Sequence, residues 1–164
     1  MPELEQKTFQ RQVAYKVRIS DILNSHLKKD DNSAGYITLN GTNVSRVNII
    51  ATMVYISEDS NFRSALIDDG TGRITLRAFE NSDFLSALDI GDVVLMVGKV
   101  REFSNDKYIM PEILKKLGNA GWLSLRKAEL DKLPNIDNEI PKPEEVIKTD
   151  EHIYSLIRSL DLGD

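Results

Sequence analysis

The segment RVNIIATMVYI at residues 46–56 opens the stretch of sequence that decides the fold, which continues to Leu117. Polar and apolar side chains alternate along it. The apolar positions are Val47, Ile49, Ala51 and Met53, and the polar positions are Arg46, Asn48 and Thr52. A period of two is typical of a strand with one buried face. The segment therefore predicts a half-buried strand rather than a helix.

Further strands are expected after this first one. They cover residues 62–67, 73–79, 93–103 and 107–114, with a short helix over 81–88 between the third and fourth strands. Clusters of Asp, Asn, Ser and Gly at residues 68–72 and 104–106 predict tight turns. Three strands, a helix and two strands is the order of the OB-fold, a partly open Greek-key barrel. The sequence thus predicts a mainly β protein, a five-stranded OB-fold barrel with flanking helices.

The flanks of this stretch are expected to form separate regions. Residues 1–16 are polar and suggest a loose arm, and residues 17–29 predict a strand-like entry and a short helix with Ser20 as its N-cap. The expected boundaries are 1–45 for the arm and short helix, 46–117 for the barrel, 121–133 for a helix after it, and 134–164 for a linker and a last amphipathic helix.

Composition narrows the functional classes. The chain has 164 residues, of which 41% are apolar and 29% charged, with a net charge of −5. The absence of cysteine excludes disulfides, thiolate zinc sites and a catalytic thiol, and the two histidines lie far apart in sequence. No nucleophile–base or carboxylate pair has supporting context. We therefore expect no enzyme, cofactor or metal. No window approaches the ~18 consecutive apolar residues of a membrane span, and residues 1–16 lack the apolar run of a secretory signal. We therefore expect a cytoplasmic location, associated with the nucleoid in an archaeon and nuclear in a eukaryote.

Alternation also predicts which side chains face outward on two neighbouring strands. The third strand should present Arg73, Thr75, Arg77 and Phe79, and the fourth should present Lys99, Arg101 and Phe103. Exposed rings stack on bases while cations follow the phosphates of a single strand. Phe62, beside the first loop, and Lys107 and Tyr108, after the last loop, could extend this path.

Each aromatic residue also has a structural interpretation. Phe62 and Tyr108, taken singly, are expected in the core or at the barrel rim, whereas Phe79 and Phe103 lie out of phase with the core and beside cations. A bulge suspected at Gly98 could shift the phase of the fourth strand and bury Phe103. Pro111 should lie at an edge or a bulge of the fifth strand.

The charge balance limits the strength of such a site. Residues 46–117 contain nine lysines and arginines against eleven aspartates and glutamates. Binding of nucleic acid by the barrel alone should therefore be modest and sensitive to salt. The Asp68–Gly72 segment allows a metal interpretation, but Asp and Gly are what a tight turn requires, and the ligand set of a calcium loop is missing.

The helix expected over residues 121–133 has a broad apolar face. It could cap the barrel, or it could pack against equivalent helices of partner subunits. The residues proposed for a partner interface are Trp122, Leu125, Leu130 and Leu133.

Four short motifs follow one another along the chain: RVNII at residues 46–50, IDDGTGRI at 67–74, GDV at 91–93 and GKVR at 98–101. Together they resemble the middle subunit of replication protein A, of the archaeal type. The likeness covers roughly residues 17–133, including Gly121–Trp122 and Leu130.

This resemblance implies a heterotrimer with two other OB-fold subunits, held by one helix from each. It implies single-stranded DNA binding in replication, repair and recombination. The stacking aromatics of the family fall on Phe79, where tryptophan is common, and on Phe103. Family members often carry a C-terminal winged-helix domain; residues 151–164 resemble its first helix, so we expect that the rest of that domain has been removed.

Two other functions remain open. A structural adaptor would assemble the trimer with little direct DNA contact, and the acidic balance favours it. An RNA-binding OB module is the third hypothesis, because the sequence alone does not distinguish the sugar.

Overall fold

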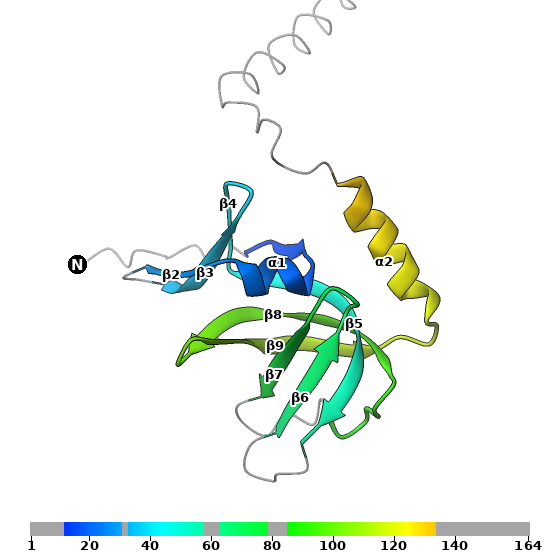
Figure 1. Ribbon diagram of the computed structural model, residues 1–164. Coiled ribbons are helices and arrows are strands. Elements are labelled where there is room, and N and C mark those ends of the chain that lie inside the picture. The colour runs from blue at the N-terminus through cyan, green and yellow to red at the C-terminus, as the bar shows by residue number, and fades with distance from the viewer. Residues whose placement is uncertain (1–11, 31–32, 58–62, 79–84, 134–164) are drawn as a thin grey trace, which may run out of the picture. The chain divides into compact units, whose positions relative to one another are not determined.

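The computed structural model describes residues 12–30, 33–57, 63–78 and 85–133 (Figure 1). The chain divides into two units, Met1–Lys132 and Leu133–Asp164. All the helices and strands below belong to the first unit.

Five strands form a closed barrel. They are β5 (Arg46–Ile56), β6 (Arg63–Asp68), β7 (Arg73–Ala78), β8 (Val93–Phe103) and β9 (Asp106–Lys116). Their spatial order is β5-β6-β7-β9-β8, and a further pairing of β5 with β8 closes the barrel. β7 and β9 run parallel, and the other pairs are antiparallel. The predicted OB-fold barrel is therefore confirmed.

The inward positions of the strands make one continuous core. Val47, Ile49, Ile67, Leu76 and Met96 are among its buried members. Each fully buried side chain of this size stabilises the fold by about 1.5–3 kcal/mol relative to an exposed one. The alternation seen in the sequence therefore corresponds to the core side of the barrel.

Gly98 lies beside a bulge in the β8–β9 pair, with the backbone of β9 close to it. The register shifts here: Val97 pairs with Ile113 and Gly98 with Pro111, so Glu112 is the extra residue and the bulge lies in β9. A Cβ atom on Gly98 would lie 2.5 Å from the carbonyl oxygen of Met110. The bulge expected near Gly98 and Pro111 is thus present, and β8 keeps its phase because the added residue belongs to its partner.

The N-terminal region is more ordered than the sequence indicates. β1 (Ala14–Lys16) pairs in parallel with the start of β5, so these three residues are not part of a loose arm. A separate three-stranded sheet contains β2 (Leu27–Asp30), β3 (Ser33–Leu39) and β4 (Thr42–Val44). Figure 1 shows this sheet beside the barrel.

The short helix differs from its prediction. α1 spans Ile19–Asn24 with Arg18, not Ser20, as its N-cap, and residues 27–30 form a strand instead of its last turn. The carboxylate of Asp21 accepts the Arg18 N–H at 3.2 Å, which fixes the earlier start. Pairing of Leu27 with Ile37 ends the helix early, because β-sheet contacts outweigh the helical periodicity.

Both ends of α1 are fastened to the barrel. At its N-terminus Asp69 Oδ2 accepts the Ile19 N–H at 2.9 Å, and Thr71 Oγ1 accepts the Ser20 N–H at 3.1 Å. At its other end the ammonium of Lys107 donates to the carbonyls of Leu23, at 2.9 Å, and Ser25. A carboxylate near the N-terminus and a cation near the C-terminus both suit the helix dipole. The 68–72 turn therefore positions a helix, which agrees with its structural interpretation.

The second helix, α2 (Gly121–Lys132), follows the barrel as predicted. The side chain of Asn119 accepts the Gly121 N–H at 2.7 Å, which fastens its first turn. Of the helix predicted over 81–88, residues 81–84 lie outside the described residues. Residues 85–88 form one turn in which Leu88 donates to the carbonyl of Leu85 at 3.3 Å. Among the described residues no helix is long and apolar enough to span a membrane.

Candidate nucleic-acid interface

One row of outward side chains crosses the barrel from strand to strand. In register, Leu66 of β6 is beside Thr75 of β7, Thr75 is beside Tyr108 of β9, and Tyr108 is beside Arg101 of β8. All four side chains are half-buried, and directly paired residues point to the same side of a sheet. The row therefore forms a continuous outer surface over β6–β9.

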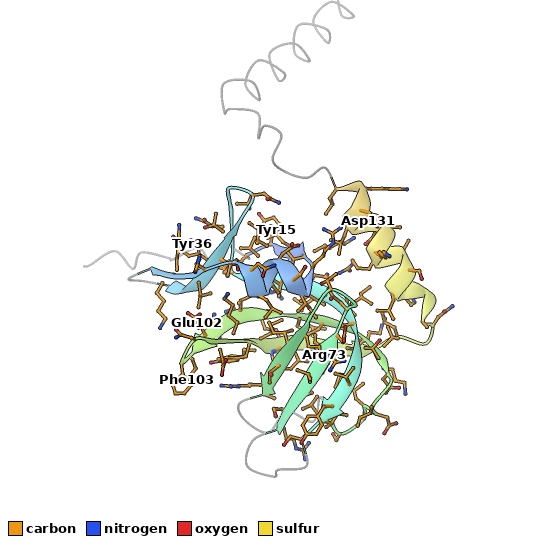
Figure 2. All side chains as sticks on the ribbon, in the orientation of Figure 1. Tyr15, Tyr36, Arg73, Glu102, Phe103 and Asp131 are labelled. Carbon is orange, nitrogen blue, oxygen red and sulfur yellow. The ribbon has the colours of Figure 1, made fainter. Side chains whose placement is uncertain are left out.

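Phe103 stands at the end of this surface. It is the last residue of β8 and is 68% exposed. Figure 2 shows it at the tip of the β8–β9 hairpin. The turn residues Ser104 and Asn105 both have positive φ, 51° and 67°, as a tight two-residue hairpin requires. The outward direction predicted for Phe103 is confirmed.

Arg77 and Tyr108 form a pair on the same surface. The guanidinium carbon of Arg77 lies 4.5 Å from the centroid of the Tyr108 ring. This is a cation–π contact, which places a positive charge over one face of the ring. Tyr108 is thus part of the outer surface rather than the core, and it joins the predicted aromatic and basic set.

The remaining predicted cations differ in how they are held. Arg73 Nε lies 2.8 Å from Asp68 Oδ2, and Lys99 Nζ lies 3.5 Å from Glu112 Oε1. Arg101 donates to the backbone carbonyl of Val100 at 3.0 Å. Within the described residues, Arg77 and Arg101 have no ion pair, so their charges are the ones most available to a phosphate.

Lys107 does not belong to this outer surface. Its ammonium is bound to two backbone carbonyls at the end of α1. This corrects the expectation that Lys107 extends the path. Lys107 is adjacent to Tyr108 in β9 and therefore points to the opposite side of the sheet, where it holds the end of α1. Phe62 and Phe79, the other predicted aromatics, lie outside the described residues.

Tyr55 is a surface residue that sequence reasoning missed. Strict alternation from Val47 to Met53 would place it inside the barrel. The register of β5 against β6 shifts between Met53 and Tyr55, so Val54 is an extra residue and Tyr55 pairs with Leu66. Tyr55 is consequently 55% exposed. Only a bulge signal could have revealed this, and the sequence around Val54 carries none.

α2 contacts the barrel through a polar side. The guanidinium of Arg126, buried to 6% exposure, donates at 2.9 Å to both the backbone and the side-chain oxygen of Asn48 in β5. Lys16 pairs with Glu129 at 3.1 Å, and Arg18 with Asp131 at 2.8 Å. Figure 2 labels Asp131 on this helix. Polar contacts therefore fix much of the helix position.

The apolar residues of α2 divide into two groups. Leu130 is buried in this chain, which corrects its expected place in a partner interface. Trp122 and Leu125 are about half exposed, as is Leu133 just after the helix. A cavity of about 150 Å³ near Leu130 is lined in part by Val17, Ile50 and Arg126. Ligand pockets are usually larger, so this cavity indicates no small-molecule site.

Ion pairs and burial shift several pKa values. The hydrogen bond from Arg73, followed by that from the Gly70 N–H, lowers the pKa of Asp68. The bond from Lys16 is the main cause of the lowered pKa of Glu129. Burial lowers the pKa of Arg126, and its bond to Glu129 opposes this. An arginine with so high an ordinary pKa nevertheless stays charged, so its hydrogen bonds to Asn48 are charge-assisted.

Metal chemistry finds no support in the described part of the chain. It contains no group of three or more His, Cys, Asp or Glu side chains that could hold an ion. The Asp69 carboxylate is occupied by N–H donors: one oxygen accepts from Ile19 and the other from Thr71 and Gly72. The surface that remains is suited to contacts with rings and phosphates.

Solved structures with the same fold include chains of multi-subunit complexes. A chain of a replication protein A heterotrimer bound to single-stranded DNA superposes with a TM-score of 0.61 at 20% identity, covering 72% of this chain and 92% of that one. A chain of yeast replication protein A bound to single-stranded DNA has a TM-score of 0.60 at 22% identity, covering 73% and 88%. A chain of the S. pombe Stn1–Ten1 complex has a TM-score of 0.61 at 15% identity, covering 72% and 88%. At these identities the likeness establishes the fold.

Among curated proteins, this chain is 31% identical over 122 residues to an uncharacterized protein of Methanocaldococcus jannaschii. The match covers 74% of this chain and 48% of the relative, so the chain spans about half of that protein's length. No protein-family model matches the chain.

Proposed function

We propose that this protein binds single-stranded DNA on the outer face of its barrel, as one subunit of a replication protein A-like heterotrimer acting in DNA replication, repair and recombination. The observation that carries the proposal is the exposed ring of Phe103 at the end of a surface that also holds Tyr108, Arg77 and Arg101. Rings that stack on bases, flanked by cations, are the requirement for binding an unpaired strand.

The charge balance favours shared binding over binding by this chain alone. The chain carries a net charge of −5, and Arg73 and Lys99 are already paired with carboxylates. Few phosphates can therefore be neutralised here, and affinity should be modest and salt-sensitive. Subunits placed along one strand would raise the overall affinity through effective concentration.

α2 supplies a surface for such assembly. Its polar side is held by Asn48 of the barrel, while Trp122 and Leu125 remain exposed. Trp is enriched at protein interfaces and among their anchor residues, and Leu125 adds apolar area beside it. We propose that α2, together with Leu133, packs against the corresponding helices of two other OB-fold subunits.

The test uses the complex that co-purifies with the tagged full-length protein. Binding of an oligothymidylate is measured at several salt concentrations for the wild type, Phe103→Ala and Phe103→Tyr. We expect Phe103→Ala to weaken binding about 5- to 100-fold and Phe103→Tyr to stay near wild type, because only the first loses the ring. Unchanged binding by Phe103→Ala would contradict the proposal. The affinity for an RNA of equal length is measured as well, and its comparison with the affinity for DNA distinguishes a DNA-binding from an RNA-binding module.

A structural adaptor is the second candidate, favoured by the acidic balance and by the exposed apolar side of α2. Leu125→Asp should then abolish assembly with partner subunits while the isolated chain keeps its unfolding temperature. If assembly fails in this variant and DNA binding survives Phe103→Ala in the intact complex, the adaptor function is the correct one.

A further inference from the structure

A bulge in β5 turns an aromatic ring onto the outer face of the barrel. Up to Met53 the odd-numbered residues of β5 are buried, and Met53 is held on one side by hydrogen bonds of 2.8 Å with Gly91 and Asp92. Val54 is then the additional residue against β6. Bulges occur often beside functional sites, because they redirect a side chain.

The new orientation is firmly set. Beyond the bulge Tyr55 pairs with Leu66 and Ile56 with Ala65, and the Ser57 N–H donates to the Ser64 carbonyl at 2.8 Å. Ile56 packs against the core, so Tyr55 must point away from it. The exposure of Tyr55 is therefore built into regular strand pairing and does not come from a loose chain end.

Tyr55 completes the row of side chains already described. Its partner Leu66 is the first member of the row that continues through Thr75 and Tyr108 to Arg101. One line of paired residues thus runs over five strands, with a tyrosine near each end. Leu66 and Thr75 between the rings carry no negative charge, so they do not repel the phosphates of a bound strand.

We propose that Tyr55 is a second base-stacking residue, which extends the bound strand from β9 across β7 and β6 to β5. This inference rests on the proposed function, because it assigns a further contact to the same surface. Measured along the row, over the curved surface of β6 and β7, β5 and β9 are three strand spacings apart, or about 14 Å. Stacked bases are about 3.4 Å apart along one strand, so Tyr55 and Tyr108 contact different bases of one oligonucleotide rather than enclosing a single base.

The experiment follows affinity against oligothymidylate length for the full chain in its complex. The variants are Tyr55→Ala, which removes the ring; Tyr55→Leu, which keeps apolar bulk without a ring; and Tyr55→Phe, which keeps the ring. We expect the first two to bind long oligonucleotides about 5- to 100-fold more weakly and to reach their limiting affinity at a shorter length. Tyr55→Phe should match the wild type.

Tyr15→Ala is the matched control. Tyr15 is also partly exposed, but it pairs with Val47, eight residues from Tyr55 along β5 and about 26 Å away. Unfolding temperatures confirm that all variants are folded, and cross-linking of 5-iodouracil at defined positions should label Tyr55. If Phe103→Ala weakens binding while Tyr55→Ala matches Tyr15→Ala at every length, this inference fails alone. If neither affects binding, the proposed function fails as well.

Discussion

The guanidinium of Arg77 lies over the ring of Tyr108, 4.5 Å from its centroid, and this pair joins β7 to β9 on the outer face of the barrel. β7 and β9 run parallel, and among the described residues theirs is the shortest ladder of the barrel, with Thr75–Tyr108 and Leu76–Ile109 as its pairs. The pair therefore combines a structural contact with a charge placed beside a ring. Its two roles can be separated by substitution.

Arg77→Gln should weaken DNA binding and reduce its salt dependence. If Arg77 contacts one phosphate, the slope of log affinity against log salt concentration should fall by about 0.7, as for one contact to a single strand. Arg73→Gln is the control, since Arg73 is already paired with Asp68. A smaller effect is expected for it, and an equal effect of the two variants would show that the Arg77 position has no special role.

Gly98→Ala should destabilise the barrel. The new Cβ would lie 2.5 Å from the Met110 carbonyl oxygen and 2.8 Å from Ile109 Cγ2, so the strands must move apart. Overpacking of this kind costs about 1–3 kcal/mol in the free energy of unfolding, measured by denaturant titration. Gly118→Ala is the matched control, because nothing lies within 4 Å of its added Cβ. Equal stabilities for the two variants would refute this account of the β8–β9 contact.

Arg126→Ala should loosen α2 from the barrel. The change removes both hydrogen bonds to Asn48. A hydrogen bond to a charged group typically contributes about 1.5–3 kcal/mol to stability. Faster amide hydrogen exchange in residues 121–132 and a lower free energy of unfolding are expected. Lys127→Ala, at the exposed neighbouring position, should leave both unchanged. The prediction is wrong if exchange in α2 is the same in both variants.

Acid should destabilise the protein through its paired carboxylates. The pKa of Asp68 is lowered by Arg73 and Gly70, and that of Asp92 by Lys116 and the Asp89 N–H. A lowered pKa in the folded state gives stability that is present above the unfolded pKa and is lost as the pH falls through the folded value. Stability should therefore decline below about pH 4.

Asp68→Asn tests this pH dependence. The amide oxygen can still accept the Gly70 N–H, but the charge opposite Arg73 is lost. The variant should be less stable than the wild type at neutral pH, and the difference should shrink in acid. A difference that stays constant from neutral pH to pH 3 would mean that the charge of Asp68 contributes nothing.

The sequence predicts the barrel well because its strands alternate and its turns have clear signals. Val94, Met96 and Val100 are buried as expected, and Phe103 is exposed, since the bulge beside Gly98 adds its residue to β9. The same logic fails at Tyr55, where the extra residue belongs to β5 itself. Alternation with a period of two predicts the face to which a side chain points only as long as no bulge interrupts the strand.

Long-range contacts account for the other differences. Lys107 is assigned to α1 by carbonyls more than eighty residues earlier in the chain. Leu130 is buried because Arg126 fixes the orientation of α2 on Asn48. Neither contact can be predicted from local periodicity. The sequence therefore identifies candidate cations and assembly residues, but it does not show which of them are already used by contacts within the chain.

The central claim is that the outer face of β6–β9 binds single-stranded DNA. The most direct measurement is titration of the isotopically labelled full-length chain with a short oligothymidylate, followed by amide and side-chain chemical shifts. The account predicts the largest shifts at Phe103, Tyr108 and Arg101, with little change in α2. Saturable shifts confined to α2 or to the β2–β4 sheet, with the outer face unaffected, would contradict it.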